Sequence, residues 1–155
     1  MSKRAQKKGL FWIYVCKVNE AKTVMIQNAN IMKTKIMIIE DSYTNRVLFK
    51  ALLEDLDIEV VEFSNAVKAL AMMDSTRPDI ILLDICMPIM TGFEFLQEFR
   101  QIYPAVPVLV ISALDEPMFI EQAYALGANE YLVKPVDSDE LIRRISCYIE
   151  CELTY

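Results

Sequence analysis

From Lys33 onward, short apolar stretches alternate with longer stretches in which apolar and polar residues mix at helical spacing. Three of the apolar stretches, Ile36–Ile39, Ile80–Leu83 and Val108–Ile111, contain no polar residue. Such uninterrupted runs are typical of parallel strands that are buried on both faces of a sheet. Together with two neighbouring candidates, they predict five strands: Lys35–Ile39, Ile58–Phe63, Asp79–Asp84, Val106–Ser112 and Glu130–Val133.

Polar capping residues mark where the first two helices between these strands begin. Ser42 is predicted to cap a helix that continues to about Leu56, and Ser64 is predicted to cap a second helix over Asn65–Asp74. Helical periodicity places several apolar residues of the first helix on one face: Val47, Leu48, Ala51 and Leu52.

Two later helices begin with capping boxes, in which a hydroxyl or carboxylate residue precedes a glutamate by three positions. Thr91 precedes Glu94 in this way, and Asp137 precedes Glu140. Apolar residues follow each box at helical spacing, which indicates helices that pack on a core: Phe95, Leu96 and Phe99 after the first, and Leu141, Ile142, Ile145, Tyr148 and Ile149 after the second.

A further helix is predicted between the two capping boxes. Asp115 precedes Pro117, a residue suited to the first turn, and Gly127 is predicted to end this helix. The chain from Lys33 therefore predicts five consecutive β–α units. Such a succession indicates an α/β fold with a doubly wound, five-stranded parallel sheet and five helices distributed over both faces.

The charge of the chain is unevenly distributed. The net charge is −6, but residues 1–32 hold six basic residues and one acidic residue, a balance of +5 that leaves −11 for residues 33–155. An acidic body argues against direct binding of nucleic acid. Histidine is absent, which excludes histidine-dependent catalysis, histidine-ligated metals and a phosphohistidine on this chain. The four cysteines form no CxxC pair, as expected of reduced thiols in a cytoplasmic protein.

Residues 1–32 do not follow the β–α pattern and are predicted to form a short N-terminal extension before a domain that spans residues 33–155. Three interpretations stay open. The extension results from the choice of start codon, since Met32 directly precedes the first strand; it adds an edge strand or hairpin; or it contacts a membrane surface or a partner. Its apolar run, Leu10–Cys16, is too short to span a bilayer. Membrane contact is therefore expected only through this extension, if at all.

Four of the five predicted strands end in residues that suit a ligand site, whereas the second ends in the uninformative pair Phe63–Ser64. Glu40 and Asp41 follow the first strand, Asp84 ends the third, Ser112 ends the fourth and Lys134 follows the fifth. In open α/β sheets, ligands bind where the carboxyl ends of the strands meet. The sequence therefore predicts a site at this edge with three carboxylates, one hydroxyl and one ammonium group.

Three neighbouring carboxylates repel one another unless a cation joins them. Oxygen ligands with positions left for water suit Mg²⁺, so we expect this cofactor at the site. A carboxylate beside Mg²⁺ can attack a phosphoryl group, and Lys134 and Ser112 would then stabilise the phosphoryl oxygens. Asp84 is the best candidate for the nucleophile because it stands alone at the end of the predicted central strand.

The sequence segments that hold these polar residues resemble the receiver domains of two-component response regulators. The resemblance covers residues 33 to about 153 and rests on five motifs in order: IIEDS, LLDICMP, MTGFEFL, VISA and YLVKP. It implies a flavodoxin-like fold with strand order 2-1-3-4-5. It also implies a phosphorylation-dependent signalling switch, not a classical enzyme.

The resemblance implies a role for each matching residue. Asp84 resembles the phosphoacceptor, which also contacts the metal. Asp41 resembles the direct Mg²⁺ ligand and Glu40 the acid that holds the metal through water, while the backbone carbonyl of Cys86 would complete the ligands. Ser112 and Lys134 resemble the pair that contacts the phosphoryl group. Tyr131 resembles an aromatic switch coupled to Ser112, although packing in the core is an equally open role for it. Lys134–Pro135 is similar to the family's cis-proline turn.

The predicted function is that of a single-domain response regulator. A histidine kinase or phosphotransfer protein would phosphorylate Asp84, and the change would alter a surface that binds a downstream protein. Two alternatives stay open: a passive phosphocarrier in a multistep relay, and a receiver domain isolated from a longer regulator or hybrid kinase. No direct partner among nucleic acids is expected. The resemblance also implies that the positions of Cys86 and Leu114 tune the lifetime of the phosphoryl group. Because neither side chain can position an attacking water well, we expect slow self-dephosphorylation.

Overall fold

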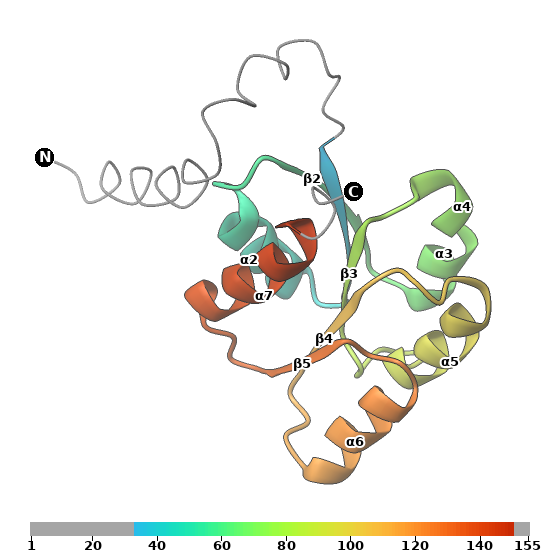
Figure 1. Ribbon diagram of the computed structural model, residues 1–155. Coiled ribbons are helices and arrows are strands. Elements are labelled where there is room, and N and C mark those ends of the chain that lie inside the picture. The colour runs from blue at the N-terminus through green and yellow to red at the C-terminus, as the bar shows by residue number, and fades with distance from the viewer. Residues whose placement is uncertain (1–32, 151–155) are drawn as a thin grey trace, which may run out of the picture. The chain divides into compact units, whose positions relative to one another are not determined.

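The computed structural model describes residues 33–150, except for the side chain of residue 150, and the predicted extension over residues 1–32 lies outside this range (Figure 1). Five parallel strands form one sheet in the order β2-β1-β3-β4-β5. This order confirms the α/β, flavodoxin-like prediction. The strands are β1 (Thr34–Ile39), β2 (Ile58–Phe63), β3 (Ile80–Leu83), β4 (Val108–Ser112) and β5 (Glu130–Val133).

Helices connect the strands and cover both faces of the sheet, as Figure 1 shows. Between residues 33 and 150 they are α2 (Tyr43–Leu53), α3 (Ala66–Ala71), α4 (Met73–Thr76), α5 (Gly92–Ile102), α6 (Pro117–Ala125) and α7 (Ser138–Glu150). None of these helices is long and apolar enough to cross a membrane.

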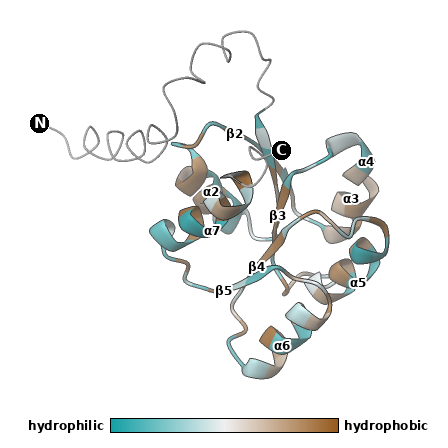
Figure 2. Cartoon of the chain, viewed as in Figure 1, coloured by the Kyte–Doolittle hydropathy of each residue, from teal (hydrophilic) through white to brown (hydrophobic). Residues whose placement is uncertain are grey.

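Two hydrophobic cores lie on opposite faces of the sheet because successive strand side chains point to opposite sides. Ile36 and Ile38 of β1 belong to the core under α2 and α7, whereas Met37 and Ile39 belong to the core under α3 to α6. β3 serves both cores and is hydrophobic along most of its length (Figure 2). The central strands therefore hold the polar residues that follow them in a rigid frame.

The packing of α2 differs from the sequence prediction. Phe49 and Leu53 are the side chains that α2 buries against the sheet. Val47 and Leu48, which share the predicted apolar face, are both substantially exposed. Apolar residues occur on two faces of this helix, so periodicity alone does not decide which face packs on the core.

The segment after β2 also differs from the prediction. The predicted single helix over Asn65–Asp74 is divided at Met72 into α3 and α4, so residues 33–150 contain six helices where five were predicted. The N-cap of α3 is Asn65, whose side chain accepts a hydrogen bond from Lys68 N, and not Ser64. An asparagine one residue later offers the same capping geometry as a serine, and the sequence did not distinguish them.

The other predicted caps can be compared directly with the structure. Ser42 caps α2, and Thr91 forms a complete capping box at the start of α5. Asp137 accepts a hydrogen bond from Glu140 N, but the carboxylate of Glu140 pairs with Arg144 in the next turn. Half of the second capping box is therefore replaced by an ion pair.

Candidate functional site

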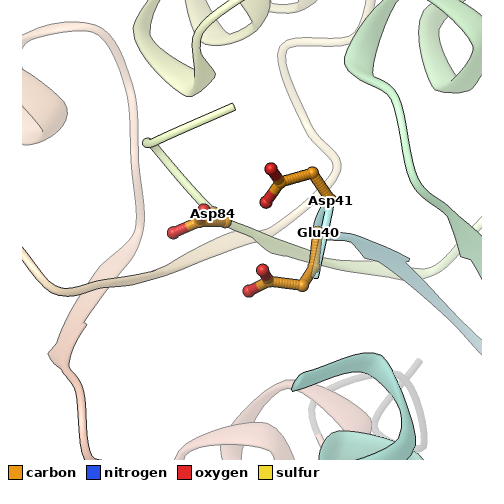
Figure 3. Close-up of side chains that lie close together, drawn as sticks. All are labelled: Glu40, Asp41 and Asp84. Atoms are coloured by element: carbon orange, nitrogen blue, oxygen red, sulfur yellow. The ribbon is translucent and has the colours of Figure 1, made fainter. Parts of the chain in front are cut away.

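Three carboxylates converge at the carboxyl end of the two central strands. Glu40 and Asp41 directly follow β1, and Asp84 directly follows β3, the strand beside it. One ligand oxygen of each lies within 4.8 Å of the others. Figure 3 shows the three side chains directed into the same space. Glu40 and Asp84 are only 2% and 5% exposed, whereas Asp41 faces solvent.

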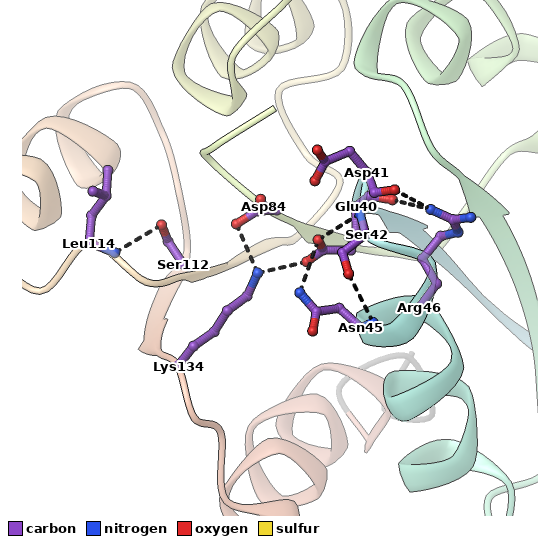
Figure 4. A network of polar contacts seen from close by, with 9 residues as sticks. All are labelled: Glu40, Asp41, Ser42, Asn45, Arg46, Asp84, Ser112, Leu114 and Lys134. Atoms are coloured by element: carbon purple, nitrogen blue, oxygen red, sulfur yellow. Dashed lines mark hydrogen bonds and ion pairs between the residues drawn. The ribbon is translucent and has the colours of Figure 1, made fainter. Parts of the chain in front are cut away.

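Lys134 reaches two of these carboxylates from the end of β5. Its Nζ lies 2.7 Å from Glu40 Oε2 and 3.1 Å from Asp84 Oδ1 (Figure 4). Burial alone would lower the pKa of Lys134, but the two carboxylates outweigh burial and raise it. The side chain is therefore a fixed positive charge at neutral pH.

Asp84 is strained electrostatically even with this partner. Burial raises the pKa of the Asp84 carboxyl, and the nearby charge of Glu40 raises it further, while Lys134 opposes both effects. A raised pKa means that the site disfavours the ionised carboxylate. An additional cation would remove this cost.

The charge balance and the donor set fit Mg²⁺. Three carboxylates face one ammonium, and within residues 33–150 no hydrogen-bond donor or cation contacts the Asp41 carboxylate. Two negative charges are therefore uncompensated, which matches a divalent cation. The ligands are all oxygens, and the exposure of Asp41 leaves access for water molecules, as Mg²⁺ requires.

The first turn of α2 holds Glu40 and its neighbour in place. Glu40 Oε1 accepts hydrogen bonds from Ser42 N and from Asn45 Nδ2, both at 3.1 Å. Arg46 Nη1 donates to the backbone carbonyls of Glu40 and Asp41, each at 2.8 Å. Sequence reasoning missed Asn45 and Arg46 because polar residues on a helix usually face solvent. The available signal was their position on the first turn, since helical side chains point back toward the N-terminus.

Ser112 and Tyr131 lie on the other side of Asp84. Ser112 ends β4, is fully buried, and accepts a hydrogen bond from Leu114 N at 3.3 Å. Tyr131 in β5 is buried and donates from its hydroxyl to Leu114 O at 2.8 Å. Burial raises the pKa of the Tyr131 phenol. The two predicted switch residues thus bind the same loop residue, and Tyr131 also packs in the core, so both roles considered for it fit its position.

The remaining predicted residues lie on loops around the site. Cys86 is on the β3–α5 loop with an exposed side chain. The peptide bond between Lys134 and Pro135 is cis. Gly92 begins α5 and donates from its backbone N to Ile85 O at 2.9 Å, which brings the start of the helix against the loop that carries Asp84.

Comparisons with known proteins agree with this geometry. Residues 36–146 match the response regulator receiver domain family. The chain is 33% identical over 112 residues to the chemotaxis protein CheY of Listeria monocytogenes, covering 72% of this chain and 94% of that protein. It is 30% identical over 118 residues to the sporulation initiation phosphotransferase F of Bacillus subtilis, covering 76% of this chain and 95% of that protein.

Solved structures share the fold. The structure of chemotaxis protein CheY4 from Vibrio cholerae superposes with a TM-score of 0.70 at 30% identity, covering 75% of this chain and 98% of that chain. The family match includes every strand residue from Ile36 onward and each predicted site residue. The chain therefore belongs to the response regulator receiver domains of two-component signalling.

Proposed function

We propose that this protein is a single-domain response regulator that is phosphorylated on Asp84 by a partner histidine kinase or phosphotransfer protein in the cytoplasm. Receiver domains are signalling switches and not classical enzymes, which agrees with the family to which residues 36–146 belong. The observation that carries the proposal is the convergence of Glu40, Asp41 and Asp84, two of which pair with the half-buried Lys134. The functional domain would extend over residues 33–155.

In this proposal, an oxygen of the Asp84 carboxylate attacks the phosphorus of a phosphohistidine. The bond between phosphorus and the imidazole nitrogen breaks, the imidazole keeps the electron pair, and Asp84 becomes an acyl phosphate. Lys134 and the Ser112 hydroxyl would contact the phosphoryl oxygens. Glu40, Asp41, Asp84 and the Cys86 carbonyl would hold Mg²⁺, whose charge would offset that of the phosphoryl group.

The switch would act through the loop after β4. Tyr131 and Ser112 both bind Leu114, so movement of Ser112 toward a phosphoryl group would disturb the contacts of Tyr131. The surface formed by α6, β5 and α7 would then change and bind a downstream protein. Neither nucleic acid nor a membrane is part of this proposal.

The exposed apolar side chains of α2 support a protein as the phosphodonor. Tyr43, the first residue of α2, is 71% exposed and lies two residues after Asp41. Val47, one helical turn later, is also exposed, and Leu48 lies beside it. This apolar strip leads away from the acidic site and fits a helical partner that presents its phosphohistidine to Asp84.

Intact-mass analysis after incubation with acetyl phosphate and Mg²⁺ tests the chemistry. We expect one labile phosphoryl adduct on the wild type and on the control variant Asp115→Asn. Asp115 is an exposed aspartate that follows β4 at the same edge of the sheet. We expect none on Asp84→Asn or without Mg²⁺. An adduct on Asp84→Asn would refute the assignment of the acceptor. Failure of the wild type to form an adduct and to bind beryllofluoride would refute the proposed function.

A passive carrier in a multistep relay is a second candidate, which the similarity to the sporulation initiation phosphotransferase F favours. The two functions differ in where the phosphoryl group goes. A carrier labelled on Asp84 would transfer the label to the histidine of a phosphotransfer domain within minutes. A regulator would keep the label and bind a target protein more tightly than the unphosphorylated form.

A further inference from the structure

Glu40 and Asp41 present a geometric problem that the fold must solve. In a strand, successive side chains point to opposite faces of the sheet. Two consecutive carboxylates that continued β1 would therefore point apart. Their oxygens nevertheless lie within 4.8 Å of each other and of Asp84. The chain accordingly leaves the strand conformation after Ile39, where β1 ends.

Arg46 holds the backbone in this bent conformation. One nitrogen, Nη1, donates to two consecutive carbonyls, those of Glu40 and Asp41, at 2.8 Å each (Figure 4). Successive carbonyls of an extended strand point in opposite directions, so they reach a common donor only where the chain bends. The contact thus fixes the two peptide groups that set the directions of the two acidic side chains.

The guanidinium group is itself anchored at a defined place. The Arg46 side chain is only 12% exposed, and its Nε lies 4.0 Å from Glu62 Oε2 on the neighbouring strand β2. The centre of the guanidinium lies 5.7 Å from the centroid of the Tyr43 ring. Arg46 therefore links β2 and α2 to the bend that carries Glu40 and Asp41.

We infer that Arg46 is a positioning residue for the Mg²⁺ site, and this inference rests on the proposed function. Arg46 touches neither the metal nor the phosphoryl group in this assignment. It acts through the carbonyls of Glu40 and Asp41, which keep both carboxylates aimed at the space beside Asp84. Partners of this kind, one step removed from the ligands, typically govern metal affinity by about 10-fold or more.

Charge and geometry predict opposite effects when Arg46 is replaced. Removal of a positive charge near a cation site strengthens cation binding if only the electrostatic field matters. Loss of the bend weakens binding because Glu40 and Asp41 no longer converge. Weaker Mg²⁺ binding by Arg46→Met therefore reports the positioning role specifically.

Calorimetric titration with MgCl₂ tests the inference on the full chain. We expect the Mg²⁺ dissociation constant of Arg46→Met to rise about 10-fold. The matched control is Lys50→Met, because Lys50 also lies on α2 and pairs with Glu62, at 3.6 Å, without contacting either carbonyl. We expect this control to bind Mg²⁺ as the wild type does. Urea denaturation of each variant shows whether it is folded during the titration.

A second variant keeps the test decisive if Arg46→Met does not fold. Lysine retains the charge at this position, but its ammonium ends one bond short of Nη1, so Arg46→Lys should bind Mg²⁺ about threefold or more weakly. Wild-type affinity in a folded Arg46→Met, or in Arg46→Lys where only that variant folds, would overturn the inference while leaving the proposed function intact. Absence of Mg²⁺ binding by the wild type would overturn the proposed metal site and this inference with it.

Discussion

An added methyl group at Gly92 should impair the chemistry of the site beyond its effect on the stability of the fold. A Cβ atom at Gly92 would lie 2.8 Å from Ile85 Cα and 2.9 Å from Ile85 Cδ1, and nearer still to the backbone carbonyl of Asp84. The contact with Ile85 Cα alone falls 0.6 Å short of the 3.4 Å of ordinary contact. Because two of these three neighbours are backbone atoms, relief requires a shift of the loop that carries Asp84.

The size of this shift sets the expected effect. Overpacking of this kind destabilises a protein by about 1–3 kcal/mol. A displacement of about 1 Å in a reacting group can slow a reaction roughly 100-fold. For Gly92→Ala we therefore expect phosphorylation by acetyl phosphate to slow by about 10-fold or more, beyond any loss of folded protein.

Gly127→Ala is the matched control within the same chain. Gly127 has a φ of 97°, a left-handed conformation that costs other residues about 1–2 kcal/mol. Its added Cβ would contact the side chain of Arg100. Gly127 lies in the loop between α6 and β5, at the opposite end of the strands from Asp84. This variant should lose similar stability and keep the wild-type phosphorylation rate. Intact-mass time courses at a temperature where both variants are folded provide the comparison, and a Gly92→Ala rate within about threefold of wild type would refute the reasoning.

Three further predictions concern stability and ionisation. Ile89 has a left-handed φ of 73° although it is β-branched, and its side chain is 84% exposed, so little packing would be lost on replacement. Ile89→Asn should therefore raise the free energy of unfolding by about 1 kcal/mol. An unchanged midpoint in urea denaturation would contradict this. The Arg100 guanidinium donates to five oxygen acceptors around the loops that precede β4 and β5. Arg100→Met should therefore lower the free energy of unfolding by about 2–4 kcal/mol. A loss below about 1 kcal/mol would show that water replaces these hydrogen bonds. Burial and the neighbouring Glu130 carboxylate raise the pKa of Tyr148 to about 12. Since the folded pKa is raised, the stability contributed by Tyr148 is complete below pH 10 and is lost as the pH rises to 12; an absorbance titration should show a tyrosine ionising near pH 12 that Tyr148→Phe lacks.

The strands and the first layer of the site were predictable from the sequence for a shared reason. Unbroken apolar runs such as Ile80–Leu83 identify buried parallel strands, and the carboxyl ends of parallel strands meet at one edge. Residues that directly follow those runs, such as Glu40 and Asp84, are therefore placed together by topology alone. Their contacts with Lys134 depend also on the length of the lysine side chain, because β4 separates β5 from the strands that carry the two carboxylates.

Features that depend on local orientation were not predictable in this way. Val47 and Phe49 are both apolar, and only packing against the sheet shows that Phe49 is buried while Val47 is exposed. Arg46 is indistinguishable in sequence from a solvated helix residue, although it binds two carbonyls. The left-handed backbone of Ile89 has no sequence signal, because isoleucine is among the residues least suited to that conformation.

The ion pairs of Lys134 have a consequence for the biosynthesis of the protein. Lys134 lies 94 residues after Glu40 and 50 residues after Asp84, and it follows β5, the last of the five strands in the sequence. A growing chain on the ribosome thus contains Glu40 and Asp84 well before Lys134, the ammonium that pairs with both, has been synthesised. Until β5 docks at the edge of the sheet, the carboxylates of Glu40 and Asp84 lack this positively charged partner. Under the proposed function, the contribution of Lys134 to phosphoryl binding therefore arises only once the domain is nearly complete.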